Sequence, residues 1–118
     1  MSRLSDELRI RTKRYASAVI QCYVKLPKDQ EEVRVLGKQL LRSGTSVAAH
    51  AREASRARSD AEFCSKIEGA LQEADESMLW LDLLRDDCAV HSEKLDWLLN
   101  ESDELIAIFA TMAHKLKH

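Results

Sequence analysis

Hydrophobic positions near the start of the chain recur at alternating spacings of four and three residues, which is the spacing of one face of an α-helix. This pattern predicts a helix over about residues 2–25. Pro27 disfavours helical backbone at the residue before it, so we expect the helix to end there and Asp29 to cap the next one. The positions of this face are Leu4, Leu8, Thr12, Tyr15, Val19, Cys22 and Leu26.

A second segment, about residues 30–57, continues the same alternation but is rich in small side chains. Gly37 and Gly44 fall on its predicted buried face. Glycine costs about 1 kcal/mol relative to alanine inside a helix. Two glycines on that face therefore predict that another backbone comes close to this helix.

Two further helices are predicted from their caps as well as from their spacing. Ser59 followed by Glu62 is a capping-box pattern, which predicts a helix over about residues 60–87. Ser92 followed by Glu93 predicts a fourth helix over about residues 92–115. Short connections force neighbouring helices to run antiparallel. The sequence therefore predicts an all-α, antiparallel up-down-up-down four-helix bundle, with residues 1–118 as a single domain.

The turn near residues 57–59 sets a register in which facing residues of the second and third helices have numbers that sum to roughly 116. On this rule Arg42 faces Glu73. The small residues of the second helix then meet Gly69 and Ala70. An ion pair in such a seam adds little net stability but penalises wrong registers. The other facing pairs on this rule are Ser46 with Ala70, Ala49 with Ile67, and Glu53 with Phe63.

Composition supports a helix-rich globular chain, since 45% of the 118 residues are hydrophobic, 32% are charged, and there are only three glycines and one proline. The charged N-terminus lacks the pattern of a secretory signal, and no apolar run approaches the roughly 18 residues of a membrane span. We therefore expect a soluble, cytoplasmic protein. Its three cysteines lack paired spacing, which favours reduced thiols over a disulfide or a zinc site.

Charge is distributed unevenly along the chain although the net charge is only -2. Residues 1–58 contain thirteen Lys and Arg against six Asp and Glu, whereas residues 59–118 contain five against fourteen. The first half is therefore net +7 and the second net -9. Three explanations stay open: compensation within one molecule, association between copies, and binding of a polyanion by the basic half.

The sequence contains no pattern typical of a catalytic or metal site. A di-iron bundle needs Glu-x-x-His on two helices, and the nearest segment, His50 to Glu53, has the reverse order and occurs once. We expect no cofactor and no metal. One polar cluster is predicted to lock the register of the second and third helices, and the alternative is a small enzyme that uses it. Its members are Arg42, Ser46, His50, Glu53, Glu73 and Glu76.

Basic side chains are concentrated on the first two helices, where they could bind the phosphates of RNA or DNA without reading sequence. A solvated or intersubunit face is the alternative. The candidate nucleic-acid-binding residues are Arg9, Arg11, Lys13, Arg14, Arg34, Lys38, Arg52 and Arg56.

A second apolar strip on the third and fourth helices does not belong to their main buried faces. Such a strip on a small bundle is typical of an interface, so it predicts contact between copies of the chain. Its members are Trp80, Leu83, Trp97 and Ile108.

Five segments together resemble the bacterial four helix bundle protein family, also called the rRNA intervening-sequence protein family because some members are encoded inside insertions in large-subunit rRNA genes. The segments are LPK at 26–28, QLLRSGTSVAAHAREA at 39–54, SDAEF at 59–63, ALQEADES at 70–77 and WL at 80–81. The resemblance spans about residues 8–110. His50 stands where this family usually has Asn.

This resemblance implies an up-down bundle that assembles as a ring-shaped homopentamer. It also implies a relationship to the accessory protein of diversity-generating retroelements, which binds nucleic acid and reverse transcriptase and is strongly basic, unlike this chain. No enzymatic activity is established for the family. We therefore expect a non-enzymatic, self-assembling scaffold or adaptor whose first two helices bind RNA, DNA or a protein partner such as a nucleic-acid enzyme. The alternative is a small enzyme of unknown reaction.

Overall fold

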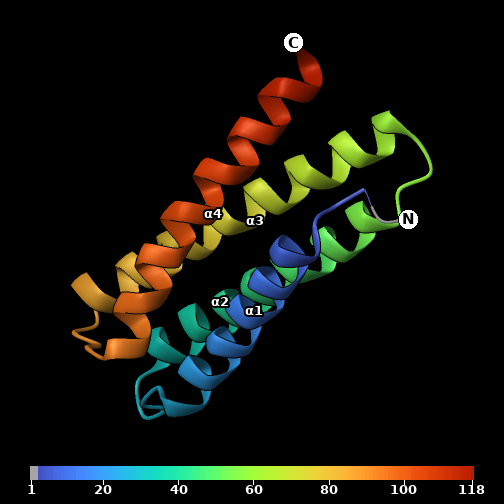
Figure 1. The fold of residues 1–118 in the computed structure, drawn as a ribbon. Coiled ribbons are helices and arrows are strands. Elements are labelled where there is room, and N and C mark those ends of the chain that lie inside the picture. The colour runs from blue at the N-terminus through green and yellow to red at the C-terminus, as the bar shows by residue number, and fades with distance from the viewer. Residues whose placement is uncertain (1–2) are drawn as a thin grey trace.

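The computed structural model describes residues 3–118, and its helices alternate in direction along the chain (Figure 1). No strand occurs in this range. The predicted antiparallel four-helix bundle is confirmed. The helices are α1 (Asp6–Lys25), α2 (Glu31–Ser55), α3 (Asp60–Asp86) and α4 (Glu93–Lys117).

Serine caps determine where three of the helices begin. The Ser59 and Ser92 hydroxyls accept backbone N–H bonds at 3.1 Å at the starts of α3 and α4, as predicted. The start predicted near residue 2 for α1 is wrong, because Ser5 caps that helix and accepts a hydrogen bond from the backbone N–H of Leu8. Residue 2 itself lies outside the described part of the chain.

The predicted cap of the second helix is also wrong. Gln30, and not Asp29, occupies the N-cap position of α2, and its side chain makes no capping bond. Acidic side chains in the first turn, Glu31 and Glu32, favour this helix end through the helix dipole instead. α2 ends at Ser55, two residues before the predicted end, and α4 continues two residues further than predicted, to Lys117.

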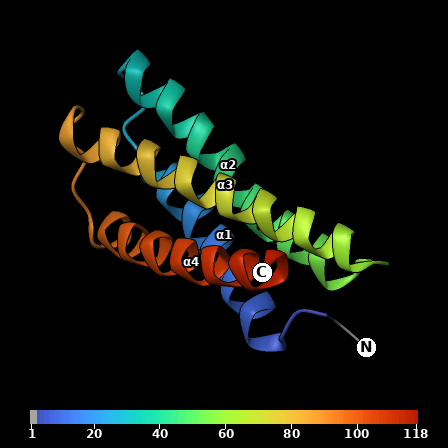
Figure 2. The same ribbon diagram turned by 90° about the horizontal axis from the view of Figure 1, so that it is seen from above.

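The four helices do not pack equally against one another. α2 makes extensive contact with α3 and with α1, and α3 with α4, whereas α1 and α4 touch over a much shorter stretch. Seen from above, α2 and α3 run side by side (Figure 2). The bundle is 46 Å long and 24 by 21 Å across. Its α1–α4 side is therefore the least closed of the four seams.

The glycines of α2 accommodate side chains of α1 and of its C-cap residue, which corrects, for these two positions, the prediction that the small residues of this helix meet Gly69 and Ala70 of α3. A Cβ on Gly44 would lie 2.6 Å from Val19, and a Cβ on Gly37 would lie 2.8 Å from Leu26. Each glycine therefore leaves the space that an α1 side chain fills. Gly69 instead accommodates the ring of His50, to which a Cβ there would approach within 2.9 Å.

The predicted register between α2 and α3 is confirmed at one of its four positions. Arg42 donates a hydrogen bond to Glu73 at 3.1 Å, as expected. The Glu53 carboxylate accepts a hydrogen bond from Lys66 at 3.2 Å. The residue expected to face Glu53, Phe63, has its side chain buried in the core. Ala49 is exposed whereas its expected partner Ile67 is fully buried. Ser46 donates to the carbonyl of Arg42 in its own helix, while its expected partner Ala70 is fully buried. The position of the turn sets how two helices align along their axes, but it does not set which faces of the helices meet.

A layer of buried hydroxyl groups crosses the middle of the bundle, with one member from each helix. Tyr15 and Ser102 lie 2.6 Å apart, and Ser43 and Ser77 lie 2.7 Å apart, measured between hydroxyl oxygens. Ser77 and Ser102 also donate to carbonyls one turn earlier in their own helices. Burial raises the pKa of Tyr15, although hydrogen bonds with Ser102 and Ser77 oppose the shift. The layer is thus a connected polar network inside an apolar core.

The three cysteines are free thiols, with Cys22 buried and Cys64 and Cys88 partly buried. Burial raises the pKa of all three, which disfavours the reactive thiolate. Between residues 3 and 118, no helix combines the length and apolar character needed to cross a membrane.

Candidate functional site

A groove of about 510 Å³ lies between the first half of α1 and the second half of α2 and is lined by four basic side chains. Two small residues of α2 help form it, and none of the nine residues that line it is acidic. The lining residues are Arg9, Ile10, Thr12, Lys13, Ala48, Ala49, Arg52, Ser55 and Arg56.

Helical spacing explains why four cations meet in this groove. Arg9 and Lys13 are four residues apart on α1, and Arg52 and Arg56 are four residues apart on α2, so each pair shares one helix face. The antiparallel packing of α1 and α2 then brings the two pairs together across the groove. Arg9 also pairs with Asp6.

Three of these cations are uncompensated. Among residues 3–118, Lys13, Arg52 and Arg56 have no ion-pair partner. Uncompensated charge facing one groove creates a local positive potential even in a chain whose net charge is -2. The groove can therefore attract anionic groups.

The other predicted basic residues lie elsewhere. Arg11 donates to Glu101 at 2.7 and 2.8 Å and to Glu104 at 2.8 Å, and these hydrogen bonds raise its pKa. Arg34 pairs with Glu31 near the opposite end of α2. Arg14 faces α4, as described below. Lys38 is exposed on α2. Of the eight candidates, four therefore line the groove and four lie outside it.

The predicted polar cluster forms pairs along the seam of α2 and α3. Arg42 contacts Glu73 at 3.1 Å and Glu76 at 3.8 Å. A hydrogen bond with Glu73 raises the pKa of Glu76. Partial burial favours a raised pKa for Glu73 too, but hydrogen bonds from Glu76, Arg42 and Ser46 together lower it. Arg42 thus contacts both carboxyl groups, whose pKa values are shifted in opposite directions.

His50 is another partly buried member of the cluster. Its Nδ1 lies 3.6 Å from a Glu53 oxygen, longer than a hydrogen bond, and has no hydrogen-bond partner in the described chain. Glu53 bonds Lys66 instead. The ring of His50 rests on the backbone at Gly69. Packing, more than polar contact, therefore positions this histidine. Neither of the two cavities described in this subsection includes a member of the cluster.

The members of the predicted apolar strip differ in exposure. Trp80, Leu83 and Ile108 are partly buried, and Trp80 and Ile108 pack against the core of their own chain. Trp97 is 39% exposed. The sequence reasoning missed a more exposed apolar set on the outer face of α1: Ile10 at 59%, Ile20 at 46% and Val24 at 69%. The available signal was that these residues lie outside the four-three spacing of the buried face.

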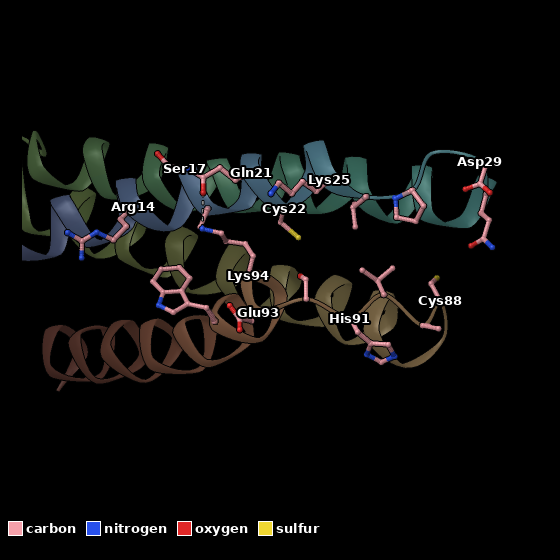
Figure 3. A pocket seen from close by; sticks show the side chains of 18 residues that line it. Arg14, Ser17, Gln21, Cys22, Lys25, Asp29, Cys88, His91, Glu93 and Lys94 are labelled. Atoms are coloured by element: carbon pink, nitrogen blue, oxygen red, sulfur yellow. Dashed lines mark hydrogen bonds between the residues drawn. The ribbon is translucent and has the colours of Figure 1, made fainter.

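A second, longer groove of about 1420 Å³ separates the C-terminal half of α1 from the start of α4 (Figure 3). Lys94 donates to Gln21 at 2.8 Å across it. Arg14 and Lys25 lie on its α1 side, and Asp29 lies at one end, in the turn after α1. The sequence pattern did not indicate this groove, because it results from the divergence of two helices.

Metal binding finds no support in the geometry of residues 3–118, where no three His, Cys, Asp or Glu side chains come together as ligands. The fold and the site define a four-helix bundle with a cationic groove between its first two helices. Residues 7–111 match the model of the 23S rRNA-intervening sequence protein family, and the chain belongs to that family.

A solved structure supports the same assignment. The chain is similar to a protein of unknown function from the S23 ribosomal protein family of Bacteroides thetaiotaomicron, with 32% identity and a TM-score of 0.79. The match covers 89% of this chain and 96% of that one. No curated protein matches the chain.

Proposed function

We propose that this protein is a non-enzymatic cytoplasmic adaptor that assembles with copies of itself and binds the phosphate backbone of RNA or DNA in the α1–α2 groove. The observation that carries the proposal is the groove itself, where four cations face one cavity that no carboxylate lines. Phosphate contacts of this kind position a nucleic acid but do not read its sequence. The groove contains no aromatic residue that could stack on a base.

Screening makes such binding compatible with a net charge of -2. The Debye length is about 8 Å at physiological salt, so a local group of cations acts largely independently of the acidic helices on the other side of the bundle. If all four cations contact phosphates, the slope of log affinity against log salt is about -3 to -4. Binding is therefore expected to be strong at low salt and weak at physiological salt.

Self-assembly is supported by exposed apolar residues of α1, of which Ile10 also lines the cationic groove whereas Ile20 and Val24 lie outside it. Ile10, Ile20 and Val24 expose large apolar side chains on one outer face of α1, where water contact is unfavourable. The opposite charges of the two halves of the chain complement each other between copies. Replacing Ile20 and Val24 by Glu should then reduce the mass measured by sedimentation, whereas Val35→Glu on α2 should not.

The enzymatic alternative receives less support. A catalytic cluster needs reactive groups that face a cavity large enough for a substrate. The polar cluster of α2 and α3 instead forms ion pairs on a seam, and its members line neither groove. These contacts fit a structural role instead, in which the cluster holds the register of the two helices.

A titration with two matched variants tests the nucleic-acid proposal. Lys13→Gln with Arg56→Gln removes two groove cations that have no ion-pair partner in the described chain. Lys38→Gln with Lys115→Gln makes the same change in net charge outside the groove. Arg11 is left intact, because its loss would also break the contact with Glu101.

Labelled RNA and DNA are titrated with each protein at two salt concentrations. We expect the groove variant to bind about 10-fold more weakly at low salt and to reduce the salt slope by roughly 1.5 to 2. The matched control should bind nearly as well as the wild type. Equal losses in both variants, or no binding at low salt, would contradict the proposal.

A further inference from the structure

Trp97 occupies a defined position in the α1–α4 groove. Two bridges fix the register of these helices: Lys94 bonds Gln21, and Glu101 bonds Arg11. Trp97 lies between Lys94 and Glu101 in the sequence, so its indole belongs to the stretch of groove between the two bridges. It is 39% exposed and lines this groove.

The α1 wall of this stretch leaves room beside the indole. Antiparallel pairing brings Ser17 and Ala18 opposite Trp97, and both line the groove with small side chains. Arg14 lies on the same wall and has no ion-pair partner among residues 3–118. An exposed aromatic face beside a cation and an open slot is the arrangement that binds a nucleobase and its phosphate in single-stranded nucleic acids.

α1 connects the part of the α1–α4 groove around Trp97 to the cationic α1–α2 groove. Residues 8–28 contain no Asp or Glu. The adjacent residues Lys13 and Arg14 line different grooves, Lys13 with α2 and Arg14 with α4. A strand bound in one groove therefore reaches the other by crossing a single helix, about 10–12 Å wide. The acidic groove residues Asp29 and Glu93 lie in the turn after α1 and in the first turn of α4.

We propose that Trp97 stacks on a base of a single-stranded RNA or DNA while Arg14 binds its phosphate, so that the protein prefers single strands to duplexes. This inference rests on the proposed function and adds a second contact outside the α1–α2 groove. A duplex keeps its bases stacked inside and cannot offer one to the indole without unpairing. The cationic groove alone binds both forms, so the preference for single strands arises at Trp97.

The two tryptophans of the chain allow a direct optical test. Trp80→Phe leaves Trp97 as the single tryptophan, and Trp97→Phe leaves Trp80, which packs against the core. Each protein is titrated with a 12-residue uridine oligonucleotide, with a duplex of the same length, and with uridine monophosphate. We expect saturable quenching by the oligonucleotide in the Trp80→Phe protein, and none in the Trp97→Phe protein.

Affinity measurements with Trp97→Leu complete the test. Loss of one base–aromatic stack should weaken single-strand binding about 10-fold and leave duplex binding unchanged. Trp97→Phe, which keeps an aromatic face, should bind single strands more tightly than Trp97→Leu. Sedimentation should give the same mass for Trp97→Leu as for the wild type.

Three results would overturn the inference: equal losses for single strands and duplexes, quenching by the monophosphate as strong as by the oligonucleotide, or a smaller mass for Trp97→Leu. The last would make Trp97 an interface residue, as its sequence pattern predicted. If Lys13→Gln with Arg56→Gln has no effect while Trp97→Leu weakens binding, the α1–α2 proposal fails and this one stands. The reverse pattern refutes the role of Trp97 alone.

Discussion

Replacement of Arg11 tests the main polar contact between α1 and α4. Arg11 makes two hydrogen bonds to Glu101, whose side chain is only 9% exposed, and one to the more exposed Glu104. Arg11→Met keeps most of the apolar length of the side chain and removes its charge. Glu101 is then left nearly buried without its cation, which is the situation in which breaking an ion pair is most costly.

The expected cost can be scaled from the exposure of the two partners. Removing one member of a fully buried pair costs about 3–5 kcal/mol. Arg11 is 27% exposed, so water already screens part of the interaction, and we expect about 2–3 kcal/mol. For a chain of this length that corresponds to a decrease in Tm of roughly 6–15 °C. It would be a substantial part of the roughly 5–15 kcal/mol that stabilises a domain.

Urea unfolding followed by circular dichroism, at one fixed protein concentration, measures the change. Arg14→Met is the matched control, since Arg14 lies on the same helix without an ion-pair partner in residues 3–118, and it should change stability by less than about 0.5 kcal/mol. Arg11→Met combined with Glu101→Met should recover most of the loss, because an apolar pair replaces a buried ion pair at little cost. The reasoning fails if Arg11→Met and Arg14→Met are equally stable, or if the double variant is no better than Arg11→Met.

Three further variants probe other parts of the bundle by the same unfolding assay. Tyr15→Phe removes one hydroxyl of the buried layer and should cost about 1 kcal/mol, the usual net value of a hydrogen bond. Glu73→Ala should cost less than about 1 kcal/mol, because its partner Arg42 is 53% exposed and stays hydrated after the change. Gly44→Ala should cost about 1–3 kcal/mol, because the new Cβ would lie 2.6 Å from Val19.

Each of these expectations has an outcome that contradicts it. A Tyr15→Phe protein more stable than the wild type would mean that the hydroxyl layer costs more than it contributes. A loss of several kcal/mol in Glu73→Ala would mean that Arg42 behaves as a buried charge. If Val19→Ala fails to restore stability to Gly44→Ala, the overlap between these two residues is not the cause of the loss.

The number, order and direction of the helices were determined by the sequence alone. Alternating spacings of four and three residues define a helix face locally, and Ser59 and Ser92 cap α3 and α4 as their positions predicted. Short connections then leave the antiparallel order as the available arrangement. The Arg42–Glu73 contact was also predictable, because the turn between α2 and α3 aligns the two helices along their axes.

The tertiary structure decided which faces meet. Sequence patterns group Arg9, Arg11, Lys13 and Arg14 together, but they lie on different sides of α1. Arg9 and Lys13 enter the groove with α2, Arg11 bonds Glu101, and Arg14 faces α4. Rotation of a helix about its axis depends on its packing against neighbours, which local spacing specifies only to within one broad face.

Dependence on packing also explains why residue spacing did not predict the contacts in the core or the shapes of the grooves. The four hydroxyl residues are visible in the sequence, yet only packing brings Tyr15 to Ser102 and Ser43 to Ser77. The position of Trp97 beside an open groove depends on how far α4 diverges from α1. That divergence is a property of all four helices packed together, and no single segment encodes it.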